Sequence, residues 1–298
     1  MPGYSPFGGS DLRKVAYPEA RVAVLPVPYE GSVSYGGGTA RGPRAILEAS
    51  AQLELYDEEL DWSIDEVGVC TLPPVEVGGD PEAVMEAIHR AALGPARDGK
   101  LVAALGGEHS ISYGLFTALL EARGKPFSVL QIDAHADLRD SYRGNRHSHA
   151  SIMARAHELG LPFVQVGIRS LSAGERAFLR GKGLERNVFW AQRIAAEGSG
   201  EGWMDEAVER LGEEVYLTVD LDGLDPALMP ATGTPEPGGL GWYATLGLLR
   251  KVAERRRIVG MDLTELAPLA GLHAPDFLAA RLAYKMIGYA LLRERSGG

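Results

Sequence analysis

Short runs of β-branched and aliphatic residues alternate along the chain with longer segments of helical periodicity. We expect buried strands at seven such runs, which span residues 21–27, 101–105, 127–133, 163–168, 187–190, 214–220 and 257–262. Apolar residues at helical spacing predict helices at residues 81–92, 113–122, 152–159 and 204–211. Because parallel strands must be joined by crossovers, which are commonly helices, this alternation predicts an α/β fold with a mainly parallel sheet covered on both faces.

The same pattern bears on domain organisation. No linker rich in proline or serine, no repeat and no low-complexity block interrupts it. We therefore expect a single domain over residues 1–298, in which residues 1–20 form an N-terminal extension before the first strand.

Acidic and histidine side chains follow four of the predicted strands. They belong to the segments Gly106–His109, Asp133–Asp137, Asp220–Asp222 and Asp262–Glu265. In open parallel sheets, ligands bind beyond the carboxyl ends of the strands. We therefore expect these four segments to meet at one edge of the sheet.

The spacing within these segments favours a metal centre. Alternate residues of an extended chain point the same way, so Asp133, His135 and Asp137 can share one face. By the same reasoning, Asp220 and Asp222 can share another. A single Asp after a strand more often caps a helix or forms a turn, but that explanation would have to apply independently to each of these residues and to His109.

The charge of this cluster indicates how many ions it would bind. Four carboxylates in one cavity would raise each other's pKa unless cations lie between them. Two divalent cations would balance the four negative charges, and the neutral imidazoles of His109 and His135 would complete the coordination. Carboxylate oxygen with some imidazole and no thiolate favours Mn²⁺ over a structural zinc site. We expect two Mn²⁺ ions per subunit.

Composition and charge exclude some partners. The formal net charge of -10 weighs against binding to nucleic acid and suits a cationic ligand. The richest apolar run, near the C-terminus, is interrupted by Arg281 and Lys285, so we expect no membrane-spanning helix. The single cysteine, Cys70, cannot form an intramolecular disulfide, and the N-terminus lacks the pattern of a secretory signal. We expect a cytoplasmic protein.

Four strings in the chain resemble the motifs of the ureohydrolase family, which comprises arginases, agmatinases and their relatives. Three of them resemble its metal signatures: GGEHS at 106–110, DAHAD at 133–137 and DLDGLDP at 220–226. DLTELAP at 262–268 resembles its fourth motif, and the glycine-rich segments 34–43 and 233–239 resemble its substrate-side loops. The similarity extends from about residue 21 to the C-terminal helix.

This resemblance implies a three-layer αβα fold around a parallel sheet of about eight strands, two Mn²⁺ ions and assembly into trimers or hexamers. Two ligand sets are implied, one of His109, Asp133, Asp137 and Asp220 and the other of Asp133, His135, Asp220 and Asp222. One departure is Glu108, where arginases commonly have Asp. That position is not itself a ligand, so the difference concerns the support of the site.

The resemblance also implies hydrolysis of a guanidinium group to urea and an amine. Guanidinium is a poor electrophile, and coordination of water to a metal supplies a strong nucleophile near neutral pH. Asp137 would carry a proton to the leaving amine and His149 would exchange protons with solvent. Glu265 would hold the guanidinium through charge-assisted hydrogen bonds. His147 is the alternative to His149, and either could be an ordinary surface histidine.

The substrate is expected to be an amine-tailed guanidine. After the Asp-x-His-x-Asp motif the chain offers Arg139 and Asp140, where arginases hold the amino-acid end of arginine with an Asn and small hydroxyl residues. Together with the segment 56–60, this resembles agmatinases more than arginases. We expect agmatine to be cleaved to putrescine and urea, a step of polyamine biosynthesis, with Arg139 and Glu30 as candidate contacts for the substrate.

Several alternatives remain at this point. N1-aminopropylagmatine, which would give spermidine and urea, as well as arginine and guanidinobutyrate, would react by the same chemistry. An inactive scaffold of the same fold is an alternative of another class, since a fold does not guarantee activity, but retention of all six candidate ligands opposes it. A binuclear phosphoesterase is a further alternative, and Glu265 opposes it because a carboxylate would repel phosphate.

Overall fold

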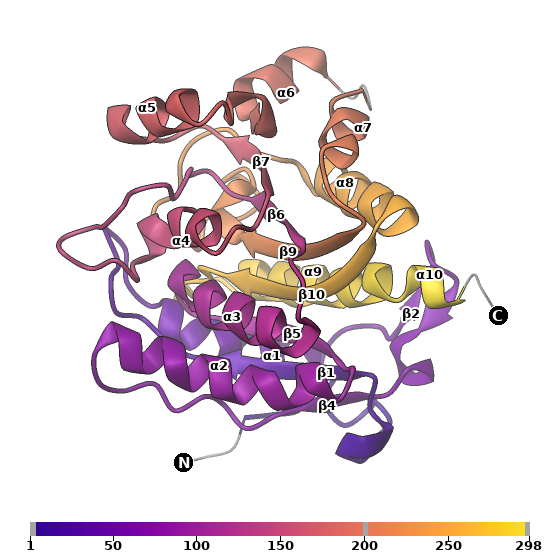
Figure 1. The fold of residues 1–298 in the computed structure, drawn as a ribbon. Helices are drawn as coiled ribbons and strands as arrows, with labels where there is room; N and C mark the ends of the chain where they lie inside the picture. The colour runs from indigo at the N-terminus through magenta and orange to yellow at the C-terminus, as the bar shows by residue number, and fades with distance from the viewer. Residues whose placement is uncertain (1–3, 199–201, 296–298) are drawn as a thin grey trace.

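A parallel sheet forms the centre of the molecule (Figure 1). The computed structural model describes residues 4–198 and 202–295, and within them the sheet has eight strands in the order β4-β1-β5-β10-β9-β6-β7-β8, with every neighbouring pair parallel. The strands are β1 (Val22–Val27), β4 (Val69–Thr71), β5 (Leu101–Gly106), β6 (Ser128–Ile132), β7 (Phe163–Ile168), β8 (Val188–Trp190), β9 (Glu214–Asp220) and β10 (Arg257–Thr264). The predicted α/β fold is confirmed, and all seven predicted strands are present.

Helices cover both faces of the sheet, as expected. One face is packed by α2 (Pro81–Arg97), α3 (Ser112–Arg123), α4 (Ile152–Glu158) and α5 (Ala173–Gly181). The other face is packed by α1 (Gly42–Ser50), α6 (Ala191–Glu197), α7 (Gly202–Glu209), α8 (Trp242–Arg255) and α9 (Ala274–Ala290), and α10 (Leu292–Arg295) follows α9. Figure 1 shows the sheet between these two layers.

Smaller elements join these layers. A two-stranded antiparallel sheet is formed by β2 (Tyr56–Asp57) and β3 (Trp62–Ser63). The short 3-10 helices are η1 (Tyr17–Glu19), η2 (Thr39–Arg41), η3 (Ile64–Glu66), η4 (His109–Ile111), η5 (His149–Ser151), η6 (Glu185–Asn187) and η7 (Leu221–Gly223). Several of them lie directly after the strand ends that carry the candidate site residues.

Local sequence explains where the helices begin and end. The Asp80 side chain accepts a hydrogen bond from the amide of Ala83 at 2.8 Å, and Pro81 occupies the first position of α2. At α5, Ser172 and Glu175 form a reciprocal capping box. Helix α3 ends at Gly124, whose φ of 66° lies in the left-handed region that favours glycine.

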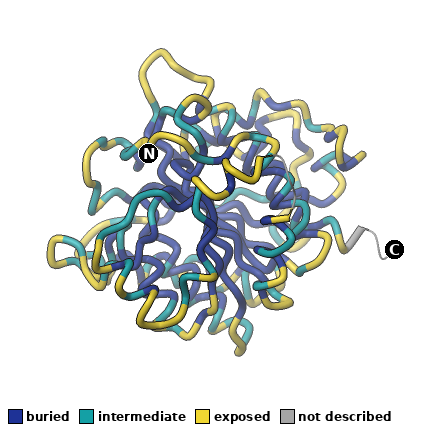
Figure 2. The backbone as a smooth tube through the Cα atoms, turned by 90° about the horizontal axis from the view of Figure 1, so that it is seen from above, coloured by how far each residue is buried: buried dark blue, intermediate teal, exposed yellow. Residues whose placement is uncertain are grey.

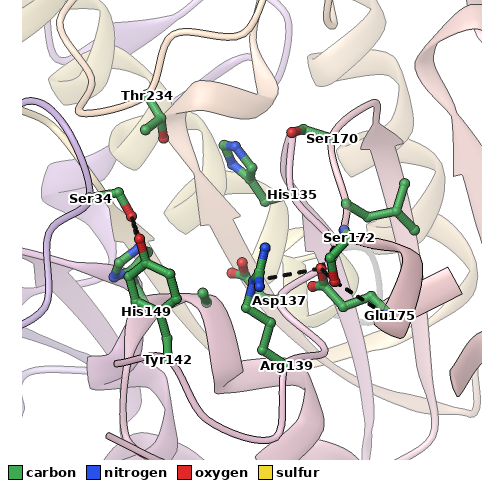
Figure 3. Close-up of a pocket in the computed structure, with 12 residues that line it drawn as sticks. Ser34, His135, Asp137, Arg139, Tyr142, His149, Ser170, Ser172, Glu175 and Thr234 are labelled. Atoms are coloured by element: carbon green, nitrogen blue, oxygen red, sulfur yellow. Dashed lines mark hydrogen bonds and ion pairs between the residues drawn. The ribbon is translucent and has the colours of Figure 1, made fainter. Parts of the chain in front are cut away.

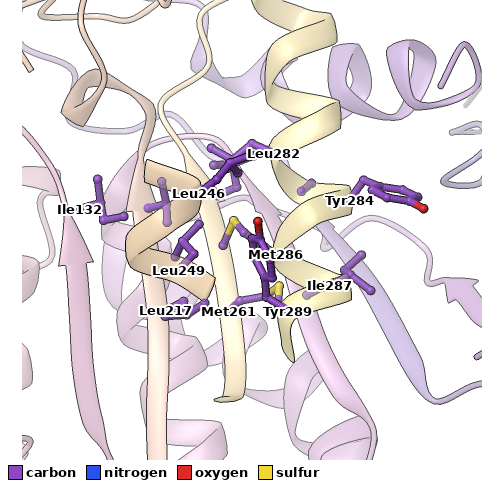
Figure 4. Close-up of a cluster of buried hydrophobic side chains, with 14 of the residues drawn as sticks. Ile132, Leu217, Leu246, Leu249, Met261, Leu282, Tyr284, Met286, Ile287 and Tyr289 are labelled. Atoms are coloured by element: carbon purple, nitrogen blue, oxygen red, sulfur yellow. The ribbon is translucent and has the colours of Figure 1, made fainter. Parts of the chain in front are cut away.

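The apolar core lies between the sheet and each helical layer. Seen from above in Figure 2, the central strands are buried and the exposed residues lie mainly in the peripheral loops. Alternation along β9 sends Leu217 to the α8 and α9 side, whereas Tyr216 packs against Phe116 of α3 with ring centroids 5.0 Å apart. Figure 4 shows Leu217 and Ile132 of the sheet facing Leu246 of α8 and the side chains of α9. The sheet is therefore anchored on both faces.

The segment before β1, which we predicted to be an extension, packs against this core. Phe7 is buried, its amide donates to the Thr71 hydroxyl at 2.8 Å, and the amide of Gly8 donates to the Ser50 hydroxyl at 2.9 Å. Within residues 4–198 and 202–295, no helix has the length and hydropathy that crossing a membrane requires.

Candidate active site

Four neighbouring strands in the middle of the sheet carry the candidate site. Strands β5, β10, β9 and β6 lie side by side, and each leads into one of the four polar segments singled out in the sequence. A close backbone approach holds the first segment in place: the amide of Gly107 donates to Val27 at 2.9 Å, and a Cβ on Gly107 would lie 1.9 Å from the carbonyl oxygen of Tyr29. Only glycine fits there, and His109 follows two residues later.

The imidazole of His109 is the first element of the candidate metal site. Its Nδ1 atom lies 3.1 Å from Asp133, 3.2 Å from Asp137 and 3.3 Å from Asp220, measured to carboxylate oxygens. All four side chains are buried, and among the described residues Nδ1 has no hydrogen-bond partner. A cation between these atoms would satisfy the imidazole lone pair and the carboxylates together.

A chain of hydrogen bonds across the sheet sets the orientation of this ring. Nε2 of His109 lies 2.7 Å from the hydroxyl of Thr218, which in turn donates to Asp262 at 2.6 Å. The hydroxyl hydrogen of Thr218 is thus used by the carboxylate, so Nε2 must carry the hydrogen that it shares with Thr218. Nδ1 is then the nitrogen free to ligate a metal, an arrangement typical of metal-bound histidines.

A second group of potential ligands adjoins the first. Nδ1 of His135 lies 3.0 Å from Asp222 and 3.6 Å from Asp133. Two sets of three side chains are close enough to hold an ion, and Asp133 belongs to both of them: His109, Asp133 and Asp137, and Asp133, His135 and Asp222. Asp133 would therefore help to hold both ions.

The pKa values of these groups reflect the crowding of like charges. Burial, together with the charge of Asp133, raises the pKa of Asp137 to about 8. Burial and the charges of Asp222 and Asp133 raise the pKa of Asp220 well above its usual range. Burial lowers the pKa of His109, but the three carboxylates within 3.1–3.3 Å of its Nδ1 outweigh this and hold the pKa well above normal. Cations between these groups would relieve the crowding of charge, and the donor set fits two divalent ions.

Two acidic residues of the site have strained backbones. Asp137 and Glu265 have φ angles of 52° and 67°, in the left-handed region that non-glycine residues rarely adopt. Glu265 is held by two contacts: its amide donates to Gly107 at 2.8 Å, and its carboxylate accepts the amide of His109 at 2.7 Å. The carboxylate lines the same cavity as Asp220 and Asp222, and burial raises its pKa well above the usual range.

A pocket of about 260 Å³ opens beside the candidate metal ligands (Figure 3). Asp137 and His135 lie on its inner side, and Arg139, Tyr142 and Glu175 line its outer part. The Glu175 carboxylate accepts the amide of Leu138 at 3.0 Å and lies 3.8 Å from Nε of Arg139. His149, Ser34 and Thr234 line both this pocket and the cavity around the ligands, so the two spaces adjoin.

The two candidate proton-shuttle histidines differ in position. His149 faces the pocket, and burial followed by the positive charges of His135 and His109 lowers its pKa to about 4. The ring of His147 instead packs against Tyr113, with ring centroids 4.8 Å apart. Of these two histidines, His149 lines the pocket and His147 is not among the described residues that line it.

The carboxylate of Glu30 is held by residues of its own loop. Its carboxylate accepts hydrogen bonds from the amide of Gly38 at 2.8 Å, the amide of Ala40 at 3.0 Å and the hydroxyl of Thr39 at 3.2 Å. It is not among the described residues that line the pocket or the cavity. Glu30 therefore orders the loop before α1, and the contact with a substrate ammonium that we expected for it stays a prediction.

Sequence reasoning missed several residues that support the site. Gln131 donates to Asp133 at 2.6 Å, and the Arg169 guanidinium donates to the carbonyl of Asp222 at 2.6 Å and to that of Glu236 at 2.8 Å. Gln131 and Thr218 each lie two residues before a ligand on the same strand, so side-chain alternation could have indicated them. No local pattern marks Arg169, because its partners are about 50 and 70 residues away.

The fold and the site together define a class of α/β protein. In this class, a carboxylate-rich centre lies at the carboxyl edge of a parallel sheet and is suited to two metal ions. The chain belongs to the arginase family, whose family model matches residues 20–288. Enzymes of this family are binuclear metalloenzymes, and this protein is a hydrolase acting on guanidino groups.

Known proteins resemble the chain over nearly its full length. It is 42% identical to an N(1)-aminopropylagmatine ureohydrolase of Synechocystis sp., covering 92% of this chain and 90% of the relative. It is 32% identical to an agmatinase of Pyrococcus horikoshii, covering 93% and 95%. The crystal structure of the agmatine ureohydrolase of Thermoplasma volcanium superposes with a TM-score of 0.83 at 31% identity, covering 95% of this chain and 94% of that one. The predicted arginase-like fold is thereby confirmed.

Proposed function

We propose that the protein is an agmatinase-type ureohydrolase that uses two Mn²⁺ ions to convert an amine-tailed guanidine, such as agmatine, into urea and putrescine. The observation that carries the proposal is the free Nδ1 of His109 among three buried carboxylates, next to a pocket large enough for a substrate tail. The preference for Mn²⁺ rests on the donor set of carboxylate oxygens with two imidazoles.

The side chains divide the chemical work between them. The metal pair, when bound, activates water as the nucleophile. Glu265 lies in the cavity with the ligands, where its carboxylate matches the planar donors of a guanidinium. Asp137, which faces both cavity and pocket, would pass a proton to the departing amine, and His149 at the pocket wall would exchange protons with solvent.

The outer pocket supports a substrate with a cationic tail, although its charges are mixed. Glu175 brings a buried carboxylate to the pocket, and Arg139 adds a positive charge beside it. N1-aminopropylagmatine is the second candidate substrate, because the relative that is 42% identical carries that activity in its name. A guanidine with an acidic tail would instead pair with Arg139 and be repelled by Glu175.

A urea-release assay on manganese-loaded protein tests the proposal. Agmatine, N1-aminopropylagmatine, arginine and guanidinobutyrate are compared at equal concentration. We expect kcat/KM for one of the two amine-tailed substrates to exceed that for arginine and guanidinobutyrate by about 10-fold or more, since a hydrogen bond to a charged group contributes about 1.5–3 kcal/mol. Absence of urea from all four substrates would contradict the function, and a preference for guanidinobutyrate would contradict the assigned tail.

Glu265→Gln is expected to separate metal binding from catalysis. The amide keeps the size of the side chain and can still accept the His109 amide, but it loses the charge that pairs with guanidinium. We expect two metal ions per subunit to remain and kcat/KM to fall on the order of 100-fold. Metal analysis and urea release on the same preparation measure both quantities, and wild-type kinetics would remove Glu265 from the mechanism.

We further propose that the protein acts in the cytoplasm as a homo-oligomer of three or six subunits, without a nucleic-acid partner. The family resemblance supports the assembly, and the net charge of -10 opposes binding to phosphate backbones. Light scattering coupled to gel filtration measures the subunit number directly.

A further inference from the structure

We propose that Glu108 is a positioning residue for His149. Glu108 acts through the hydroxyl of Ser32, which fixes the ring hydrogen of His149 on Nδ1. Nε2 is then the nitrogen that exchanges protons. The inference rests on the proposed function, because it gives a task to the histidine that exchanges protons there. It also assigns a role to the residue that distinguishes this GGEHS motif from the arginase pattern.

Glu108 is completely buried and all of its hydrogen-bond partners are donors. Its Oε2 accepts the amides of Gly31 and Ser32, each at 2.6 Å. Its Oε1 accepts the hydroxyls of Ser32 at 2.7 Å and Ser110 at 2.6 Å. The side chain therefore connects the strand end that carries His109 to the loop after β1.

Ser32 connects this carboxylate to His149. The hydroxyl oxygen of Ser32 lies 3.0 Å from Nδ1 of His149 and also accepts the backbone amide of His149 at 3.1 Å. A serine hydroxyl has one hydrogen, and here Glu108 receives it. Ser32 can then only accept from the ring, so Nδ1 of His149 must be the nitrogen that carries the hydrogen.

The other ring nitrogen faces the pocket. Nε2 of His149 lies 2.9 Å from the hydroxyl of Ser34, which donates to the hydroxyl of Tyr142 at 3.2 Å. In this arrangement Ser34 accepts from a protonated Nε2, and rotation of its hydroxyl can turn the hydrogen to Nε2 when the ring is neutral. Both Ser34 and Tyr142 line the pocket. Because Nδ1 keeps its hydrogen whether the ring is neutral or charged, a proton gained or lost by His149 is exchanged at Nε2, beside these pocket hydroxyls.

Glu108→Gln would reverse the polarity of this chain without changing its shape. The amide oxygen is expected to remain against the two backbone amides, which places the NH₂ group against Ser32. Ser32 must then accept from Gln and donate to Nδ1, which moves the ring hydrogen to Nε2. We expect kcat to fall about 10-fold or more, with KM within about 2-fold and metal content unchanged.

A small diffusible base distinguishes this role from a general loss of structure. Imidazole buffer at rising concentration is expected to restore part of kcat in Glu108→Gln and in Ser32→Ala, as it should in a His149→Asn reference, while wild-type turnover stays constant. Ser110→Ala is the matched control, because it removes the other hydroxyl from the same carboxylate oxygen without touching His149. We expect it to keep kcat within about 2-fold and to show no response to imidazole.

The ring hydrogen can also be observed without turnover. In metal-free protein labelled with ¹⁵N-histidine, the signal that disappears in His149→Asn is expected to report hydrogen on Nδ1 in the wild type and on Nε2 in Glu108→Gln. Four results would overturn the inference. They are wild-type kcat in Glu108→Gln, a loss of kcat shared by Ser110→Ala, a loss of kcat that imidazole does not relieve, and an unchanged position of the ring hydrogen in Glu108→Gln. Failure of the wild type to release urea would instead contradict the proposed function, and the ¹⁵N measurement would still decide the role of Glu108.

Discussion

Asp133→Asn is expected to abolish metal binding and urea release together. Asp133 belongs to both candidate ligand groups, with carboxylate oxygens 3.1 Å from Nδ1 of His109 and 3.6 Å from Nδ1 of His135. The neutral amide keeps the volume of the side chain but removes the charge shared by both ions. We expect less than one metal per subunit and a fall in kcat/KM beyond the roughly 10–100-fold typical of residues that only support a ligand.

Asp222→Asn provides the comparison for this experiment. Asp222 lies in one of the two ligand groups, near His135, whereas His109, Asp133 and Asp137 form the other. We expect this variant to retain about one metal ion per subunit and to lose most of its turnover, because the proposed chemistry needs two ions. Metal analysis and titration calorimetry measure the stoichiometry, and two ions with normal urea release in Asp133→Asn would refute a shared ligand.

The metal-free protein is expected to lose stability as the pH rises from 6.5 to 8. In this range the unfolded chain has already ionised its aspartates, whereas the folded protein still holds a proton on Asp137, whose pKa is raised to about 8. Histidines lose their proton in the unfolded chain near pH 6.5, but His109 and His135, with raised pKa values, keep theirs when folded. The folded state thus binds more protons throughout this range, and the free energy of unfolding falls with rising pH.

Manganese is expected to reverse this loss. Ions at a thousand times their dissociation constant would stabilise the folded state by about 4 kcal/mol per site, which corresponds to about 6 °C in Tm per site for a protein of this size. The increase should be larger at pH 8 than at pH 6.5, since fewer protons then compete for the ligands. Calorimetric scans with and without chelator measure it, and a metal-free Tm that rises over this pH range would contradict the proposed charge arrangement.

The sequence alone determined the fold class and pointed to the candidate ligand residues, because both depend on short-range periodicity. Runs of apolar residues separated by helical segments indicated seven strands, and the alternation in Asp133, His135 and Asp137 indicated a shared face. Strand β4 was not predicted because its sequence, Val-Cys-Thr, offers a single aliphatic residue, whereas the equally short β8 is a continuous apolar run, Val-Phe-Trp.

Only the tertiary structure decided which atoms face one another at the site. The choice of Nδ1 of His109 as metal ligand depends on Thr218 and Asp262, which lie on neighbouring strands more than a hundred residues further along the chain. The contact of Ser32 with His149, which lies 117 residues further along the chain, depends equally on the paths of loops between distant strands. Such pairings are set by crossovers and backbone contacts over the whole fold, so no local pattern of residue types encodes them.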